Sequence, residues 1–445
     1  MLLRSKIIAA TVLSTLLMTA SFAQVKKVEA KYRRSSLHTI LLEGDFPKKD
    51  TVIAAYKSAP FPDKYDDHNV GDKSFNVKDY PVNDSVKTEE VKNSPPSITK
   101  FFNDKKIGNK LVAKWFNRQL DGTFDMSLIG DRGAYNATEM QASVAKGAAR
   151  GSALLRDAGI ELLGNTFVVV TKMNFISNEI TARIIRDAGI IAATQISNPL
   201  IQKGTILALN IAYDKAKEGY SIWSTSYLYK LKWNDSVEAV FYNNYWIDKS
   251  SIDKNKKEAF EKAQFDMEFV GMEKAAALIT FSFKVKRSEV EIIKEGTIRS
   301  VDAVYSKLQK KYDVFKTKTP ISSVDPVTAK IGLKEGVEGG DRFEVLEQGI
   351  DDKTGLTKYT RKGVVTADKK MIWDNRYVAG EAAPVIATTT TVTSTISTTN
   401  TTTNGVNTTS TTKDVKEEEK VLVDRTTFKG GAKSFYPGML IRQIK

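Results

Sequence analysis

The C-terminal fold is decided by the stretch Ile331–Gln348, which reads "IGLKEGVEGGDRFEVLEQ". Three glycines fall within its segment Gly336–Gly340. A phosphate-binding loop places such glycines in front of a helix, because the first N–H groups of that helix hold the anion. Here the glycines precede a run in which Phe343 and Val345 alternate with charged residues, which is the pattern of a strand. The sequence therefore predicts a turn between strands and no phosphate site.

Strand-like runs continue after this turn, at residues 356–375 and in the last residues of the chain. The glycine-bearing pattern resembles the small SH3-like β-barrel at the C-terminus of the flagellar assembly T protein family. The resemblance is carried by Ile331, Gly332, Gly336, Val337, Gly340, Asp341, Phe343, Val345, Gly438, Met439 and Ile441. It implies a barrel fold and a cell-envelope setting, and neither an activity nor a flagellar role. We expect residues 321–445 to form this barrel.

A threonine-rich run, Thr388–Thr412, interrupts the expected barrel. Fifteen of its twenty-five residues are Thr, and none is charged. Because it has few large apolar side chains to bury, we expect a disordered loop at 388–412. The runs "VLVDRTTF" and "GMLIRQIK" follow it. We expect them to return to the barrel as its last strands.

Residues 101–320 are predicted to form an α+β domain, in which a mixed α/β core is joined by antiparallel strands. The segment Thr166–Met173 is almost continuously apolar, as in a strand buried on both faces. Residues 136–159 have the capping residues of a helix. A second helix is predicted at 298–315, where one apolar stripe comprises Ile298, Val301, Val304, Leu308 and Tyr312.

The run Tyr220–Trp233 alternates with period two and predicts a half-buried antiparallel strand. We expect "NDS" to turn the chain and residues 237–246 to return as a second strand. Residues 279–286 alternate again. The aromatic and Asn side chains of the expected hairpin either line a ligand groove or pack under a helix. As a candidate binding site they comprise Trp233, Tyr242, Asn243, Asn244, Tyr245 and Trp246.

Two similar segments, residues 153–161 and 183–191, contain the motif Arg-Asp-Ala-Gly. They represent either a duplicated αβ unit or two helices that end with the same capping residues and a terminal glycine.

Residues 24–100 are polar and proline-rich, and we expect an extended N-terminal arm that packs on another part of the protein. Within it, His68 lies near Asp63, Asp66, Asp67 and Asp72. This group is either a carboxylate–histidine site for a hard metal or a base, or a polar turn. The aspartate spacing does not match a calcium loop.

The first residues have the features of a secretory signal peptide, which we expect at residues 1–23. Arg4 and Lys6 precede the apolar stretch Ile7–Met18, and small residues stand before the expected cleavage site. No later apolar run has the roughly 20 residues of a membrane-spanning helix. The chain has no Cys and a net charge of +14, with both signs interleaved along most of its length. We therefore expect no disulfides and no nucleic-acid partner.

The whole chain also resembles a class of uncharacterised secreted proteins from Gram-negative bacteria of the Bacteroides group. The resemblance is carried by "RRSSLHTILLEGDFP", "PFPDKYDDHN" and "WFNRQLDGTFDMSLIGDRGAYNA". It implies an exported protein that lies in the periplasm, at the outer membrane or on the cell surface.

Catalytic motifs are missing from the sequence. With two His and no Cys, Ser–His–Asp chemistry must use His38 or His68, and neither a Cys nucleophile nor a three-histidine zinc site is available. We predict no catalytic residue, no cofactor site and no metal site. The first hypothesis is a non-enzymatic envelope scaffold or binding module whose partners are envelope proteins or anionic or glycan polymers. The alternatives are a glycan or peptidoglycan hydrolase with paired carboxylates and a fimbria-like surface subunit.

Overall fold

The computed structural model describes residues 35–81, 90–136, 162–217, 220–279, 288–350, 357–377 and 423–444. They belong to one compact unit, Tyr32–Lys445. Four predictions fall wholly or mostly outside these residues: the signal peptide at 1–23, the helix at 136–159, the alternating run at 279–286 and the Thr-rich loop at 388–412.

A mixed β-sheet forms the centre of the fold, with strand order β2-β1-β4-β5-β6 and β3 also paired with β1. β1 runs parallel to β2, β3 and β4, whereas β5 is antiparallel to both β4 and β6. The strands are β1 (Ser36–Glu43), β2 (Asp66–Asp67), β3 (Ser74–Asn76), β4 (Thr166–Ser177), β5 (Tyr220–Leu231) and β6 (Met267–Ile279). The predicted strands at Thr166 and Tyr220 are confirmed.

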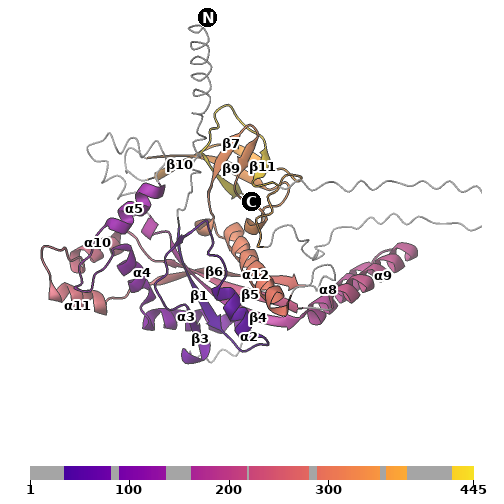
Figure 1. Ribbon diagram of the computed structural model, residues 1–445, viewed down its shortest axis with the longest axis horizontal. Coiled ribbons are helices and arrows are strands. Elements are labelled where there is room, and N and C mark those ends of the chain that lie inside the picture. The colour runs from indigo at the N-terminus through magenta and orange to yellow at the C-terminus, as the bar shows by residue number, and fades with distance from the viewer. Residues whose placement is uncertain are drawn as a thin grey trace, which may run out of the picture. The chain divides into compact units, whose positions relative to one another are not determined.

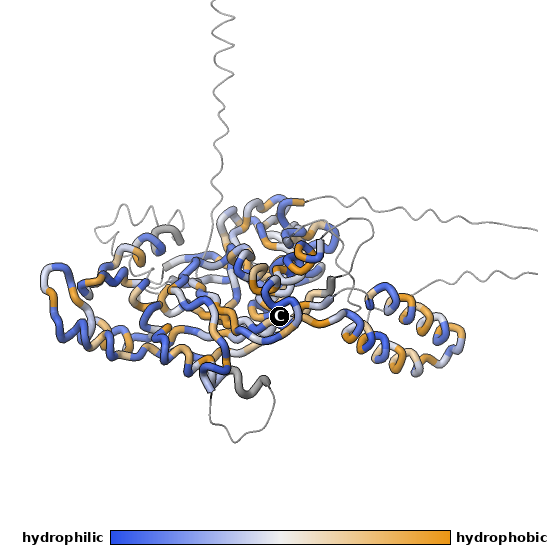
Figure 2. Tube along the Cα trace, turned by 60° about the horizontal axis from the view of Figure 1, so that its bottom comes forward, coloured by the Kyte–Doolittle hydropathy of each residue, from blue (hydrophilic) through white to orange (hydrophobic). Residues whose placement is uncertain are grey.

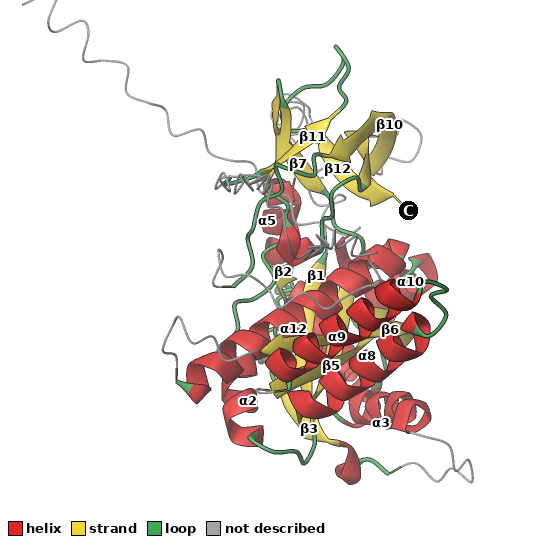
Figure 3. Ribbon diagram, turned by 90° about the vertical axis from the view of Figure 1, so that its right-hand side faces the viewer, coloured by secondary structure: helices red, strands yellow, loops and turns green. Residues whose placement is uncertain are grey.

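Helices cover both faces of this sheet, so that the domain has three layers (Figures 1 and 3). One face packs against α3 (Glu90–Asp104) and α4 (Ile107–Trp115), and the other packs against α2 (Lys49–Lys57) and α12 (Glu289–Lys311). β4 is buried on both sides, as predicted, because alternate residues enter different cores. Val168 and Val170 face α3 and α4, while Phe167 and Val169 face α12.

The predicted C-terminal helix of this domain is confirmed as α12 and begins earlier, at Glu289. Ser288 and Glu291 form a capping box there, which satisfies the first N–H groups of the helix. In the predicted stripe, Ile298, Val304 and Leu308 are buried. α12 is therefore the main cover of one sheet face.

The expectation of an extended N-terminal arm is wrong for the described part of residues 24–100. β1 is an interior strand of the sheet, and Leu37, Ile40 and Leu42 are each at most 1% exposed. α2 and most of α3 also belong to this region, together with the 3-10 turn η1 (Val77–Asp79). The prolines misled the prediction, because Pro95 and Pro96 lie inside α3 rather than in an extended segment.

The predicted return strand at 237–246 is also wrong, because this segment contains helix α10 (Asp235–Asn244). The side chain of Asn234 accepts a hydrogen bond of 3.0 Å from the N–H of Val237, and it therefore caps the helix. Val237, Phe241 and Tyr245 then fall on one helical face and pack into the same core. The remaining helices near this core are α5 (Ser127–Asn136) and α11 (Lys254–Lys262).

The C-terminal part is a closed six-stranded barrel of order β10-β11-β8-β7-β12-β9, which confirms the predicted small barrel. Its strands are β7 (Thr319–Val324), β8 (Val327–Ala329), β9 (Arg342–Ile350), β10 (Thr357–Ala367), β11 (Thr426–Lys429) and β12 (Leu440–Ile444). β11 and β12 are the two strands predicted to follow the Thr-rich segment. The barrel core includes Val337, Phe343, Val365, Phe428 and Ile441.

The glycine-rich stretch at the barrel entrance is a turn that leads into a strand, as predicted. The 3-10 turn η2 (Asp313–Phe315) connects α12 to the barrel. A second 3-10 turn, η3 (Leu333–Glu335), lies between β8 and β9 at the start of the glycine-rich stretch. Gly336 follows η3 at φ 72° and Gly340 has φ 98°, which is backbone that favours glycine. A Cβ at Gly336 would collide with Oγ of Ser306 on α12. Glycine at position 336 is therefore favoured both by the positive φ of the turn and by the close contact with α12.

Candidate functional site

The candidate binding residues of the sequence analysis lie together, around Phe241 in an aromatic core. Trp233 and Trp246 lie 5.7 and 6.0 Å from Phe241 between ring centroids. Tyr242 and Tyr245 pack against the same core, and their rings are half-buried. Only Asn243 and Asn244 of the set are exposed. The four aromatic side chains thus contribute to packing.

The environment of His68 differs from both interpretations of the sequence, because the ring is buried. One ring nitrogen, Nε2, lies 3.0 Å from the carbonyl of Leu111, and Nδ1 lies 3.0 Å from Nη1 of Arg132. Arg132 also donates to Oγ of Ser36 at 2.7 Å, and its guanidinium stacks over Trp115. Burial, followed by the charge of Arg132, holds the pKa of His68 well below its usual value.

These contacts join β1, α4 and α5 around a neutral imidazole, and both ring nitrogens have protein partners. Two of the neighbouring aspartates pair with lysines: Asp72 pairs with Lys110, and Asp63 pairs with Lys64 and Lys334. Among the described residues, no group of three or more His, Asp or Glu side chains is arranged to hold a metal ion. The His68 cluster therefore connects elements of the fold.

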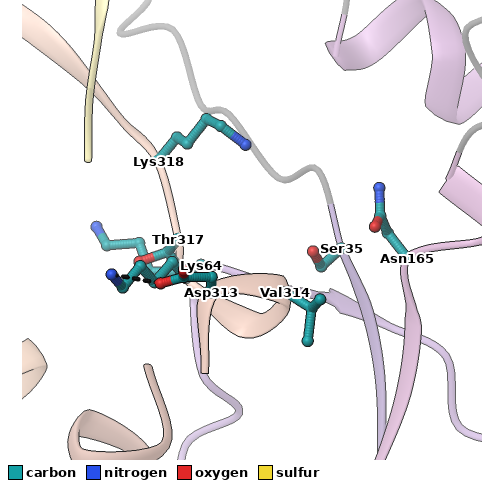
Figure 4. A pocket seen from close by; sticks show the side chains of 8 residues that line it. Ser35, Lys64, Asn165, Asp313, Val314, Thr317 and Lys318 are labelled. Carbon is teal, nitrogen blue, oxygen red and sulfur yellow. Dashed lines mark ion pairs between the residues drawn. The ribbon is translucent and has the colours of Figure 1, made fainter. Parts of the chain in front are cut away.

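A small polar pocket of about 160 Å³ lies where η2 approaches the start of β1 (Figure 4). Ser35 and Asn165 lie on one side of it, with Lys64, Asp313 and Thr317 on the other. Typical ligand pockets enclose about 300 to 1,000 Å³. The pocket is therefore small for an organic ligand.

The lysines of this pocket already have partners within the protein. Lys316 pairs with Asp313 at 2.7 Å, and Lys64 donates to the carbonyl of Lys330 at 2.7 Å. The ammonium group of Lys318 lies 4.3 Å from the ring centroid of Tyr359. The lining holds one carboxylate and no aromatic side chain. It therefore lacks the paired carboxylates and stacking rings of a sugar-cleaving cleft.

The strongest candidate for an interaction site is the helical hairpin formed by α8 (Asn178–Ala193) and α9 (Pro199–Ala216). This hairpin connects β4 to β5. Ser177 caps α8, and Asn198 caps α9 by accepting from the N–H of Leu200 at 3.0 Å. Pro199 occupies the first turn of α9, where its missing N–H has no cost. Local sequence chemistry thus fixes where each helix begins.

The two helices pack closely on each other through Gly189. One of the two interpretations of the repeated motif ends a helix at this glycine, and it is wrong for this copy because α8 continues to Ala193. A Cβ at Gly189 would lie 2.8 Å from Cδ2 of Leu209, so glycine permits the close approach of α9. The guanidinium of Arg186 also stacks 4.3 Å from the ring centroid of Tyr213.

On each helix the side that faces away from these contacts is apolar and exposed, so the hairpin carries two apolar stripes that point away from each other. Figure 2 shows hydrophobic residues along both helices. Seven of the fifteen exposed large hydrophobic side chains in the described residues lie here. We call the two stripes together the outer face, defined by Ile180, Ile184 and Ile191 on α8 and by Leu200, Ile201, Leu207 and Ile211 on α9. No residue of α9 is buried. Exposed apolar patches of this kind mark interaction sites.

α9 was not predicted, although its sequence carries a signal. Apolar residues occur on every side of this helix, at Leu200, Ile206, Leu207, Leu209 and Ile211. A helix that is apolar all round is normally buried. The exposure of such a helix therefore identifies the hairpin as a candidate interaction site.

Comparison with known proteins adds no family: the sequence matches no protein-family model and no curated protein. Among the helices that the structure describes, none is both long and apolar enough to span a membrane.

Proposed function

We propose that the protein is an exported, non-enzymatic component of the cell envelope that acts as a scaffold or binding module. The outer face of the α8–α9 hairpin is the surface through which it docks. The observation that carries the proposal is the gathering of seven exposed Ile and Leu side chains on this one element. The leader-like residues 1–23 support export.

The physical reason is the cost of leaving this face in water. Burying a Leu or Ile side chain completely is worth about 1.5 to 3 kcal/mol. The seven side chains are between 48% and 75% exposed, so a partner that covers them gains a large part of that energy at each position. A rim of charged residues, including Arg183, Asp187 and Lys215, keeps the element compatible with water until it docks.

Capture of the tagged protein from its own cell envelope tests the proposal. The double variant Leu207→Glu/Ile211→Glu places two charges on the outer face. The matched control is Leu120→Glu, because Leu120 is 99% exposed and lies outside the hairpin. We expect the wild type and the control to co-purify with the same envelope component, and the double variant to lose it.

Two results would overturn the proposal. One is retention of the same partner by the double variant, which would place docking elsewhere. The other is hydrolysis of a glycan or peptidoglycan substrate by the purified protein at the rate of an ordinary enzyme, which would favour the hydrolase alternative.

A further inference from the structure

We infer that the α8–α9 hairpin docks on a lipid bilayer and lies flat in its surface, with the outer face among the acyl chains. The inference deepens the docking role proposed above and rests on it. It starts from the directions of the two apolar stripes, which point away from each other. A rigid partner that covers one stripe leaves the other in water, whereas a fluid apolar phase covers both.

The two helices carry similar side chains at equivalent positions. They run antiparallel (Figure 1), and Gly189 of α8 meets Leu209 of α9, so each position of α8 corresponds to the position twenty residues later in α9. Such a pair has an approximate two-fold axis perpendicular to its plane, which keeps equivalent positions on the same broad side. The matching pairs include Ile180 with Leu200, Arg183 with Lys203, Ala188 with Ala208, and Ile191 with Ile211.

Small apolar residues connect the two stripes across one broad side of the hairpin. Successive residues of a helix are about 100° apart, so the residue before the contact position points to the same broad side in both helices. Ala188 and Ala208 hold this position, and Ala192 and Ala212 follow one turn later. All four alanines are exposed. The apolar surface therefore covers three sides of the hairpin, which are its two edges and this broad side.

Charged side chains are gathered on the fourth side. Arg183 and Lys203 each precede the contact by six residues, which turns them about 120° from it towards the other broad side. Lys215, on the apolar broad side, is in the last turn of α9, where a long side chain reaches the headgroups. The other six charged residues of the two helices lie on the charged side or at its border: Glu179, Arg183, Arg186, Asp187, Lys203 and Asp214.

This distribution is that of an element that lies in a membrane surface. Amphipathic helices bury their apolar side about 5 to 10 Å deep at the boundary of the headgroups and keep their charged side in water. A helix is about 10 Å thick, so this depth covers the alanine side and both edges of the hairpin. A protein surface laid on the alanine side would leave the large Ile and Leu side chains at the edges exposed. A bilayer is therefore the occupant that covers the whole outer face.

Flotation with vesicles of phosphatidylethanolamine and phosphatidylglycerol tests the inference. The chain is purified from its own cells, and high salt is used to screen adsorption through charge alone. We expect the wild type to float with the vesicles. Three double variants place charges on the three apolar sides in turn: Ile184→Glu/Ile191→Glu, Leu207→Glu/Ile211→Glu and Ala188→Glu/Ala208→Glu. Each is expected to lower the partition coefficient about tenfold or more.

The matched control is Leu120→Glu/Ile252→Glu. It adds the same charge at two exposed apolar positions outside the hairpin, where Leu120 is 99% and Ile252 is 61% exposed. We expect it to float like the wild type. All of these proteins share the same N-terminal residues, so any binding through residues 1–23 is common to them.

The absence of cysteine allows a measurement of depth. Ala208→Cys and Asn210→Cys place an environment-sensitive fluorophore on the apolar and on the charged broad side. We expect vesicles to shift the emission of the label at 208 to the blue, and lipids with a quencher on the acyl chain to quench it. The label at 210 is expected to keep its emission in water. Unchanged circular dichroism and unfolding midpoints will establish that the Glu variants are folded, since their substituted side chains are exposed.

Three results would overturn the inference: a wild type that does not float, flotation that is unchanged in all three double variants, and a label at 208 that stays in water. So would a loss confined to one or two of the three sides, which is the pattern of a protein partner. These failures are separable from failure of the docking role. If the wild type binds no vesicles and Leu207→Glu/Ile211→Glu still loses its envelope component, docking stands and the bilayer is excluded. If neither flotation nor capture responds to the substitutions, both proposals fail.

Discussion

At the scale of single residues, buried ionisable side chains set how stability responds to pH. Asp302 lies on α12, where burial raises its pKa to about 7, with Lys334 opposing the shift and Glu335 and Asp63 adding to it. In β1, burial lowers the pKa of His38 to about 4. The two groups act in opposite directions between pH 4 and 6.5. Their contributions to the pH dependence of the free energy of unfolding partly cancel, and single substitutions are needed to separate them.

Asp302→Asn is expected to stabilise the protein at pH 8 and to change little at pH 4. The folded state favours the protonated carboxyl, so stability falls as the pH rises from about 4 to 7 and is constant above that range. A shift of about three pKa units corresponds to at most about 4 kcal/mol, at 1.36 kcal/mol per unit. Urea unfolding at pH 4, 6 and 8 measures the effect. The exposed Asp131→Asn serves as the control, and equal gains for both variants would contradict the assignment.

His38→Leu is expected to remove part of the loss of stability on acidification. A base whose pKa is lowered by folding contributes stability above its unfolded value of about 6.5, and this contribution is lost as the pH falls towards 4. His68 acts in the same direction, so the slope will shrink without vanishing. Unfolding free energies at pH 7, 5.5 and 4.5 measure the change. An unaltered slope would show that His38 does not titrate in this range.

At the scale of elements, helix capping explains why residues 237–246, which the side-chain pattern assigned to a strand, belong to a helix. Residues 237–246 are rich in aromatic and β-branched side chains, which favour strands. Asn234 nevertheless begins α10, and the spacing of Val237, Phe241 and Tyr245 suits a helix packed on one side. The capping hydrogen bond and the burial of one helical face together outweigh the preference of these side chains for strands.

Asn234→Ala is expected to lower the free energy of unfolding by about 0.5 to 2 kcal/mol, because it removes the bond to the N–H of Val237. Asn243→Ala, at an exposed position within α10, is the control and is expected to change stability by less than about 0.5 kcal/mol. Thermal unfolding of the three proteins compares them. A control as unstable as the capping variant would mean that the cap contributes nothing specific.

How much the sequence could predict depended on whether an element carries one clear pattern. β4 and α12 were predictable because Thr166–Met173 is continuously apolar and the residues from Ile298 to Leu308 form a single stripe. The apolar run of β1 could be read as a strand, but its place inside the sheet could not be predicted, because the surrounding segments are rich in proline and charge and its partner β4 is more than one hundred residues away. The outer face of the hairpin was missed because α9 has apolar residues on all sides.

At the scale of the whole molecule, the barrel and the sheet domain are joined by close contacts along α12. Gly336 lies against Ser306, and Lys310 pairs with Glu338 at 3.3 Å. The hydroxyl of Tyr65, which follows α2, donates to the carbonyl of Phe315 at 3.0 Å. The first two contacts couple the barrel turn to α12, and the third joins η2 to the segment after α2.

Gly336→Ala is expected to destabilise the protein by about 2 kcal/mol or more, from backbone strain at φ 72° and from collision with Ser306. Ser306→Ala in the same chain is expected to restore part of the loss, since it removes the colliding oxygen but leaves the strain. A double-mutant cycle measured by denaturant unfolding gives the coupling. Strictly additive losses would mean that the turn does not press on α12.

The position of β12 has a consequence for how the chain is made. This strand is hydrogen-bonded between β7 and β9, both of which are translated about one hundred residues before it. Until β12 emerges, two neighbouring strands present bare backbone edges to whatever other polypeptide is near. The barrel therefore cannot close before β12 has been translated, and a chain cut short before Leu440 would keep both edges open.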